Sequence, residues 1–401
     1  MRVRARTGNG RSAVRRWRLP ALLLPALLVA GTAVAQAPES FGALRPAEMS
    51  VSHPGRVLID PTARAGQLKR LDTMQRRRLC PPVAIDPDMP PVLKLAGSVD
   101  ETQHGSIDRS ALPFAMALMQ GTAAALNGDE QAARNTIKLL DNWARANALS
   151  ELVDIGPERN NYVAQYSLRR VMLAVLPSWA LLYGRADADT RKRIDGWVAQ
   201  RMAATEQPVG PADSRKTAHP SMAKMDYYQL MREALAMEYA AMTGSNEGFR
   251  RGVTAYLTTL RQMRDDGSLP LETAHGSRAL WYQRHAIASL VTMAQIASGQ
   301  GTNLYDAEVD GKHLDRAINF LLSESTDPHQ IASYAPENQD LGFLQRRPDG
   351  RDFMAWIEPW MAHANVGPIP DGDPLQVAIS DRPLIDEIAG GNASCQMAPV
   401  R

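Results

Sequence analysis

Residues 271–287 concentrate side chains that can transfer protons and neutralise negative charge. The stretch reads LETAHGSRALWYQRHAI, and its ionisable members are Glu272, His275, Arg278, Tyr282, Arg284 and His285. If the stretch is helical, spacings of three and four residues put His275, Arg278 and Tyr282 on one face. Such a face offers positive charge for a carboxylate and a phenol or an imidazole for proton transfer. The alternative interpretation is an amphipathic helix whose Trp281 points inward while its charges face water.

Other aromatic and polar stretches offer further candidates. Tyr227 and Tyr228 lie together near the start of a predicted helix, where they serve either as platforms for sugar rings or as core residues. A polar loop at 336–340 precedes the segment 356–360, whose proline should end or kink a helix. His219 lies in a predicted loop. The sequence contains no glycine-rich phosphate loop, no serine nucleophile elbow and no cysteine–histidine spacing typical of zinc sites.

The elements that must position these residues are helices. Apolar residues recur at spacings of three and four, as Ile137, Leu140 and Ala144 illustrate. The predicted helices cover 111–126, 131–148, 162–183, 188–205, 221–243, 247–264, 276–298, 312–324 and 352–364. Short turns of Gly, Asn and Asp join them into hairpins. Because such hairpins stack side by side and curl, we predict an all-α fold: an α/α toroid, that is, an incomplete helical barrel of antiparallel helix hairpins.

The segments on either side of this domain differ from it in composition. The first 35 residues combine seven arginines with an apolar run and a small-residue end, which indicates a signal peptide cleaved after Ala35 and a periplasmic or secreted protein. Prolines then dominate up to about residue 105, which predicts an extended arm with one short helix around 67–77. The predicted boundaries are 1–35 for the signal peptide, 36–105 for the Pro-rich N-terminal arm, 106–366 for the toroid domain and 367–401 for a C-terminal tail.

The charge balance argues against nucleic-acid binding. The formal net charge is +2, but removing the seven arginines of the signal peptide, which contains no acidic residue, leaves −5. Nucleic-acid-binding proteins need clustered positive charge, and no later run is apolar for long enough to cross a membrane. We therefore expect a soluble monomer that binds neither nucleic acid nor, after signal cleavage, a membrane. Cys80 and Cys395 either form a disulfide in an oxidising compartment or stay free.

Several segments together resemble the alginate lyase family, polysaccharide lyase family 5. Residues 267–282 resemble its G-x-L-P-x-E-L-x-R…R-A-L-x-Y-H signature, and 337–340 with 355–360 resemble its E-D-Q-D…A-W-L-E-P-Y segment. The run at 143–149 is similar to its early W-A-x-A-G-A-L helix, and Cys80-Pro81-Pro82 is similar to its cysteine-proline start. The resemblance implies a cleft in an α/α toroid that degrades acidic polyuronates by β-elimination. Nothing in the sequence calls for a cofactor or a metal.

The resemblance also assigns roles to single residues. The family's acid tyrosine falls on Tyr282, whereas its charge-neutralising arginine falls on His275. Its asparagine–histidine pair at the start of a long helix falls on Tyr227 and Tyr228. The other departures are at Leu95, near a family tyrosine, and at Gln283, in place of a family histidine. These departures imply either a rebuilt site or a site that has lost catalysis.

We hypothesise a lyase that cleaves a β-linked polyuronate of the alginate/mannuronan or glucuronan type. Tyr282 is the acid and can also be the base, and Tyr228 assists proton abstraction. Arg278 or His275 neutralises the uronate carboxylate. The residues expected to bind the polysaccharide are Tyr227, His219, His285, Gln339, Trp281 and Trp360.

Two alternatives stay open. One is a non-catalytic periplasmic polysaccharide-binding protein on a lyase fold. The other is a toroid glycoside hydrolase that works with two carboxylates, such as Glu272 and Asp340, if these lie at a suitable separation across the cleft.

Overall fold

Short polar side chains begin most of the helices. The computed structural model describes residues 41–99, 105–106, 108–155, 162–207, 225–364 and 373–400, which all belong to one compact unit. The residues that accept hydrogen bonds from the backbone N–H groups of a first helical turn include Asp60, Asp72, Asp129, Asp187, Asp226 and Ser245. Because these N–H groups have no partner within the helix, the caps fix where each helix starts. The predicted signal peptide lies outside the described residues.

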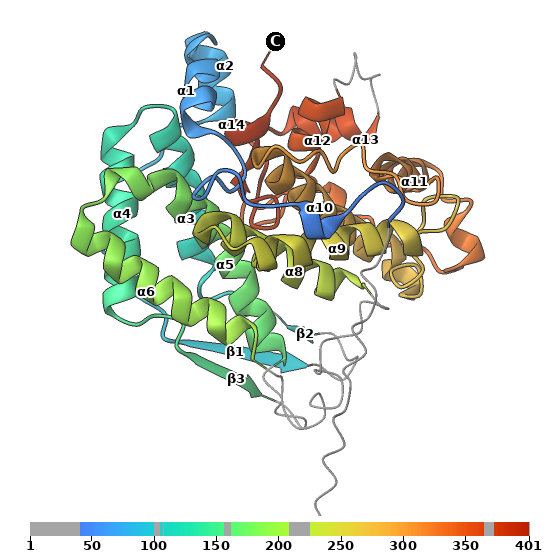
Figure 1. Cartoon of the computed structure of the whole chain (residues 1–401), viewed down its shortest axis with the longest axis horizontal. Coiled ribbons are helices and arrows are strands. Elements are labelled where there is room, and N and C mark those ends of the chain that lie inside the picture. Colours follow the sequence, from blue (N-terminus) through green and yellow to red (C-terminus); the bar gives the residue numbers. More distant parts are fainter. Residues whose placement is uncertain are drawn as a thin grey trace, which may run out of the picture. The chain divides into compact units, whose positions relative to one another are not determined.

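The helices of the main domain form two series (Figure 1). Their bounds are α3 (Leu112–Leu126), α4 (Glu130–Arg145), α5 (Tyr162–Leu182), α6 (Ala188–Thr205), α8 (Tyr227–Thr243), α9 (Asn246–Gln262), α10 (Ala279–Gly299), α11 (Leu314–Thr326) and α12 (Ile357–Ala364). Helices α3, α5, α8 and α10 contact one another in that order. Helices α4, α6, α9 and α11 pack against the outside of this series, chiefly on α3, α5, α8 and α10 respectively. Antiparallel hairpins stacked in this way form the predicted α/α toroid.

The helix that carries the candidate site, α10, is buried on nearly all of its sides. Its buried side chains include Leu280, Ile287 and Val291. A helix with apolar residues all round belongs in a protein interior. It contacts α8, α9, α11 and α12, so residues in its first turn are held firmly in place.

The N-terminal arm is more structured than the sequence predicts. It contains two helices, α1 (Pro61–Lys69) and α2 (Thr73–Leu79), where one was expected around 67–77. The break lies at Asp72, whose side chain forms a capping box with Gln75 and starts a new helix. The arm also supplies strand β1 (Lys94–Val99), which pairs with β2 (Gly105–Ser106) and, in parallel, with β3 (Glu151–Ile155).

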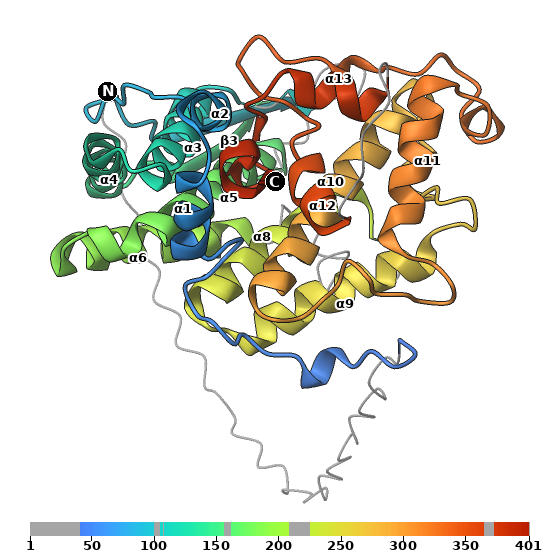
Figure 2. The same cartoon turned by 90° about the horizontal axis from the view of Figure 1, so that it is seen from above.

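The prediction of a C-terminal tail is wrong. Residues 384–398 are buried almost throughout, and they form β4 (Ile385–Asp386), β5 (Gly391–Asn392) and α14 (Ala393–Met397), after the short helix α13 (Pro374–Ser380). Strand β5 packs on α3 and α5, and α14 packs on α2, α3 and α12. In Figure 2 the C-terminal segment, in red, runs among the helices and not away from them. The reason is the spacing of apolar residues such as Ile388 and Met397, which enter the core.

A disulfide joins the arm to this C-terminal segment. Cys80 and Cys395 are bonded although 315 residues separate them. Of the two alternatives that the sequence left open for these cysteines, the structure shows the disulfide. The guanidinium of Arg64 adds hydrogen bonds to the backbone oxygens of Ser394, Cys395 and Ala398.

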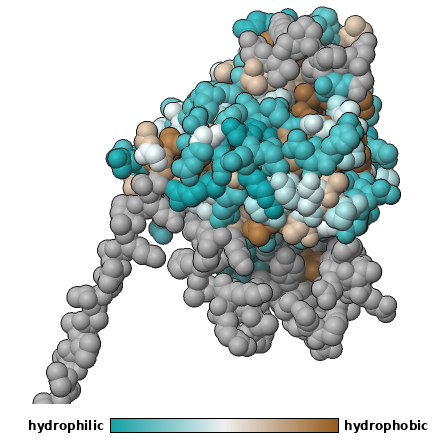
Figure 3. All heavy atoms as spheres, turned by 90° about the vertical axis from the view of Figure 1, so that its right-hand side faces the viewer, coloured by the Kyte–Doolittle hydropathy of each residue, from teal (hydrophilic) through white to brown (hydrophobic). Residues whose placement is uncertain are grey.

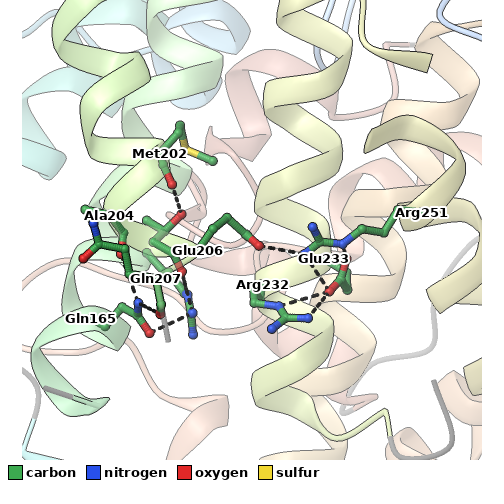
Figure 4. Close-up of polar contacts among 10 residues, drawn as sticks. Gln165, Met202, Ala204, Glu206, Gln207, Arg232, Glu233 and Arg251 are labelled. Atoms are coloured by element: carbon green, nitrogen blue, oxygen red, sulfur yellow. Dashed lines mark hydrogen bonds and ion pairs between the residues drawn. The ribbon is translucent and has the colours of Figure 1, made fainter. Parts of the chain in front are cut away.

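A cluster of polar side chains ties α6 and α9 to α8 (Figure 4). Arg251 of α9 donates to Glu206 beyond the end of α6 and to the buried carboxylate of Glu233 on α8. Arg232 donates to the same carboxylate. Since Glu233 lies in the second turn of α8, these bonds help to hold the start of that helix, which enters the candidate site.

The face of the molecule in Figure 3 is mostly hydrophilic. Large apolar side chains that are well exposed are few, and they include Met74 and Val377. Among the helices that the structure describes, none is both long and apolar enough to span a membrane.

Candidate active site

Tyr282 lies in the first turn of α10, beside two other ring side chains. Its half-buried ring has its centre 4.3 Å from that of Tyr227, the first residue of α8. The same distance, 4.3 Å, separates it from the imidazole of the exposed His275. Tyr227 and His275 also contact each other, with their ring centres 6.0 Å apart. Two phenols and an imidazole therefore form one cluster near the molecular surface.

His275 and Arg278 reach this region from a short turn and not from the helix. His275 precedes the 3-10 turn Gly276–Arg278, Arg278 is the last residue of that turn, and α10 begins only at Ala279. The helix predicted from residue 276 therefore starts three residues later, and His275 still contacts Tyr282. The guanidinium Nε of Arg278 lies 4.0 Å from Oδ2 of Asp340, and both side chains are about 40% exposed.

Two carboxylates hold the start of α8. Asp226 caps the helix by accepting from the N–H of Gln229 at 2.8 Å, and Oε1 of Glu272 accepts from the N–H of Tyr227 at 2.7 Å. Burial, with the neighbouring Asp226, raises the pKa of Glu272 well above its usual range. Glu272 is fully buried, so it positions Tyr227 and is not a carboxylate facing a sugar. The pairing of Glu272 with Asp340 for glycoside hydrolysis is thereby contradicted.

Tyr228 and His285 form a deeper layer behind the cluster. The ring of Tyr228 stacks on that of Tyr166 with the centres 5.6 Å apart, and its side chain is nearly covered, at 7% exposure. His285 is also buried, and its ring centre lies 5.0 Å from that of Tyr227. Burial first, and then the charges of Arg284 and Arg170, lower the pKa of His285 well below its usual range. The imidazole of His285 is therefore neutral at physiological pH.

Gln339 has a structural role beside the cluster, and its part in substrate binding stays a prediction. Its Oε1 accepts from the N–H of Leu280, and its Nε2 donates to the backbone oxygens of Gly276 and Glu337. The backbone N–H of Asp340 adds a 2.7 Å bond to the oxygen of Ser277. These bonds fasten the loop before residue 341 to the start of α10.

The two tryptophans of the prediction differ in position. Trp281 is half-buried, with its ring against the edges of Phe343 and Phe353. Trp360 is 7% exposed, and its Nε1 donates to Asp315 of α11 at 2.7 Å. Trp360 is thus a core residue that joins α12 to α11, and the prediction that it binds substrate is wrong. His219 lies outside the described residues.

Two departures from the family pattern are explained by packing. Gln283 is fully buried, where it accepts from the N–H of Leu269 and donates to the oxygen of Gly267. It braces the turn before the site and does not reach the cluster. Leu95 is fully buried in β1, so it offers no group to a substrate.

Sequence reasoning missed the polar residues of α5. Tyr166 lies between Tyr228 and His285, and its ring centre is 6.3 Å from that of His285. Arg169 and Arg170 are both buried, and the guanidinium carbon of Arg169 lies 4.9 Å from the ring centre of Tyr228. Two adjacent arginines in an otherwise apolar helix were the available signal, because buried arginines need partners. Within the described ranges, no three His, Cys, Asp or Glu side chains are grouped to hold a metal ion.

Comparisons with known proteins agree with this architecture. The family model described as alginate lyase matches residues 61–331. A polysaccharide lyase of Stenotrophomonas maltophilia (strain K279a) is 30% identical over 239 residues, which are 57% of this chain and 67% of that protein. An alginate lyase of Pseudomonas putida (strain W619) is 28% identical over 236 residues, which are 57% of this chain and 58% of that protein. The chain thus matches about three fifths to two thirds of the length of these relatives.

Solved structures share the fold. The crystal structure of alginate lyase A1-III from Sphingomonas species A1 superposes with a TM-score of 0.68 at 21% identity, over 89% of this chain and 99% of that one. A complex of an alginate lyase A1-III variant with a tetrasaccharide superposes with a TM-score of 0.67 at 21% identity, over 87% of this chain and 97% of that one. At such identities the likeness establishes a common α/α toroid.

Proposed function

The chain belongs to the alginate lyase family of polysaccharide lyases, and we propose that it cleaves a β-linked polyuronate of the mannuronan or glucuronan type by β-elimination. The observation that carries this proposal is the contact of the half-buried Tyr282 ring with both His275 and Tyr227, at 4.3 Å between ring centres in each case. A phenol at the surface next to a group that can carry positive charge is what this reaction requires.

The chemistry assigns a task to each member of the cluster. In β-elimination the C5 proton of the uronate is removed, a C4–C5 double bond forms, and O4 leaves with a proton. The uronate carboxylate opposes this step while it is negative, because more charge develops beside it, so its neutralisation lowers the barrier. His275 and Arg278 are the exposed cationic candidates for that task.

Tyr282 carries the proton transfers. In β-linked mannuronate or glucuronate the C5 proton and O4 lie on the same face of the ring, so one phenolic oxygen can take the proton and return it to O4. The side chain of Tyr228 is nearly covered, whereas that of Tyr227 is half-buried beside Tyr282. We therefore assign to Tyr227 the assisting role that the sequence suggested for Tyr228.

The polymer and the reaction are tested together. We expect purified protein to release unsaturated uronate ends from mannuronan or glucuronan, measured by their ultraviolet absorbance, with guluronan and hyaluronan assayed in parallel. Binding without unsaturated ends would favour a non-catalytic polysaccharide-binding protein. New reducing ends without unsaturation would favour hydrolysis.

The role of Tyr282 has its own test. Tyr282→Phe should lower kcat by about 10²–10⁴-fold, since it removes the group that transfers the proton, while the helical circular dichroism stays unchanged. Tyr183→Phe, at an exposed tyrosine after α5, is the matched control and should keep full activity. A Tyr282→Phe protein as active as this control would refute the assignment.

Export to the periplasm or the exterior is part of the proposal. It is supported by the Cys80–Cys395 disulfide, because disulfides form and persist in oxidising compartments.

A further inference from the structure

A group of buried charges lies behind the aromatic cluster. It consists of Arg170 on α5, Arg284 on α10, Arg351, and the Asp386–Glu387 pair of the C-terminal segment, all at most 7% exposed. We call these five residues the cationic cluster. The three guanidinium carbons surround one ring, that of Phe353, at 5.9, 4.7 and 5.3 Å from its centre.

The two carboxylates do not balance the three arginines. Glu387 pairs directly with Arg170 and, at 2.9 Å, with Arg351, whereas Asp386 reaches Arg170 only at 4.0 Å. Burial and the adjacent Glu387 raise the pKa of Asp386 to about 7. Glu387 is also buried, but Arg170 and Arg351 lower its pKa, so it carries the negative charge of the pair.

Arg284 is the least compensated of the three cations. Its Nε and Nη1 have no hydrogen-bond partner among the residues that the structure describes. Asp349 neutralises part of the charge of Arg351, with 2.8 Å between its carboxylate and Nη2, but no ion pair joins Asp349 to Arg284 among the described residues. Positive charge is therefore left in the interior next to α10.

This charge is close to the residues that face the substrate. The guanidinium carbon of Arg170 lies 6.0 Å from the ring centre of Tyr166, and Tyr166 contacts His285. His285 follows Arg284 in α10 and contacts Tyr227. A continuous path of side chains therefore leads from the cationic cluster to the tyrosine pair.

We propose that Arg170 and Arg284 are positioning residues of the active site, held by Asp386 and Glu387, and that they supply positive potential behind Tyr227 and Tyr282. The inference rests on the proposed lyase function. The need for such a potential follows from the site itself, because the exposed cationic candidates are a single imidazole, that of His275, and Arg278, which lies near a carboxylate. In a buried setting, fixed charges act with little screening.

His285 reports this potential. The groups that face it are Arg170 and Tyr166 from α5, Tyr227 from α8, and Arg284 from its own helix. The two arginines lower the pKa of His285 in addition to the effect of burial. Removing one arginine should therefore raise that pKa, whereas a lysine in its place should keep it low.

The first experiment measures His285 without substrate. Its imidazole signal is followed against pH by nitrogen-15 NMR in the full-length protein and assigned by its absence in His285→Gln. We expect the protonation of His285 to move to higher pH in Arg170→Gln and Arg284→Gln, and to stay as in the wild type in Arg170→Lys. Arg382→Gln, which breaks a different buried-carboxylate pair with Glu358, is the matched control and should leave His285 unchanged.

The second experiment measures the pH profile of kcat on mannuronan and glucuronan. Arg170→Gln should lower kcat by about 10-fold or more, and Arg170→Lys should restore most of it. Glu387→Gln keeps both arginines but removes the ion pair that holds Arg170 in place. Its kcat should therefore fall while His285 stays neutral. Arg382→Gln should match the wild type.

Two results would overturn the inference. One is a His285 titration that Arg170→Gln and Arg284→Gln both leave unchanged. The other is an equal loss of kcat in Arg170→Gln, Arg170→Lys and Arg382→Gln, which would indicate a general loss of stability. The two claims can fail separately, because the NMR titration needs no turnover. A wild-type protein without lyase activity would refute the proposed function, whereas the titration of His285 would still show whether Arg170 and Arg284 supply the positive potential.

Discussion

The adjacent residues Tyr227 and Tyr228 have different surroundings because successive helical residues point about 100° apart. Tyr227 is half-buried and contacts Tyr282, whereas Tyr228 is covered and stacks on Tyr166. The sequence identifies the pair as notable but does not say which member faces the site. That distinction depends on where α8 begins, and the bond from Tyr227 to Glu272 sets this start.

Phenylalanine variants of the two tyrosines separate their roles. Tyr227→Phe should lower kcat at least about 10-fold more than Tyr228→Phe, because the ring of Tyr227 is half-buried against Tyr282, where the proton transfers take place. Tyr228→Phe should act chiefly on stability, as it changes a buried side chain. Initial rates of unsaturated product and thermal melting of both variants decide the matter. The reverse order of kcat values would contradict our assignment.

At the scale of single elements, α8 carries a buried acid away from the site. Glu238 is fully buried, and neither carboxylate oxygen has a hydrogen-bond partner among the described residues. Burial raises the pKa of Glu238 well above its usual range. The folded protein therefore binds a proton that the unfolded chain releases above about pH 4.3. Stability is thus favoured at low pH and is lost as the pH rises toward the folded-state pKa.

Glu238→Gln should remove this loss of folding stability at higher pH. We expect the variant to be more stable than the wild type at pH 7, by up to about 3 kcal/mol, with a difference that shrinks toward pH 4.5. Urea unfolding of both proteins at several pH values between 5 and 8 measures the difference. A gap that is independent of pH would show that Glu238 is not protonated on folding.

Element boundaries were predictable where local signals mark them. The helix predicted at 188–205 is α6 (Ala188–Thr205), preceded by its Asp187 cap. The helix predicted from residue 276 begins instead at Ala279, because the loop held by Gln339 shapes the turn before it. That loop lies some 60 residues further along the chain, and a local pattern contains no information about it.

At the scale of the whole molecule, the residues missed by the sequence are joined over long separations. Tyr282 could be identified because a local motif surrounds it. Arg170 and Glu387 contact each other although more than 200 residues lie between them, and one sequence does not reveal such pairs. The prediction of a C-terminal tail is wrong for the same reason, because the apolar residues of this segment find their partners on α3 and α5, which lie far away in the sequence.

The Cys80–Cys395 bridge closes the chain over 315 residues and should stabilise the fold mainly by restricting the unfolded chain. Replacing both cysteines by alanine should lower the free energy of unfolding by about 2–5 kcal/mol, since the arm and the C-terminal segment then lose their covalent link. Chemical unfolding with and without a reductant measures this loss. Reduced wild type and the double variant should unfold alike, and the reductant should not affect the variant.

The bridge should also affect catalysis, because Asp386 and Glu387 belong to the C-terminal segment that it anchors. In the reduced enzyme, at temperatures where this segment separates from the N-terminal arm, the dependence of kcat on pH should change on the acidic side. An enzyme whose stability and pH profile are both indifferent to the reductant would show that packing alone holds the C-terminal segment in place.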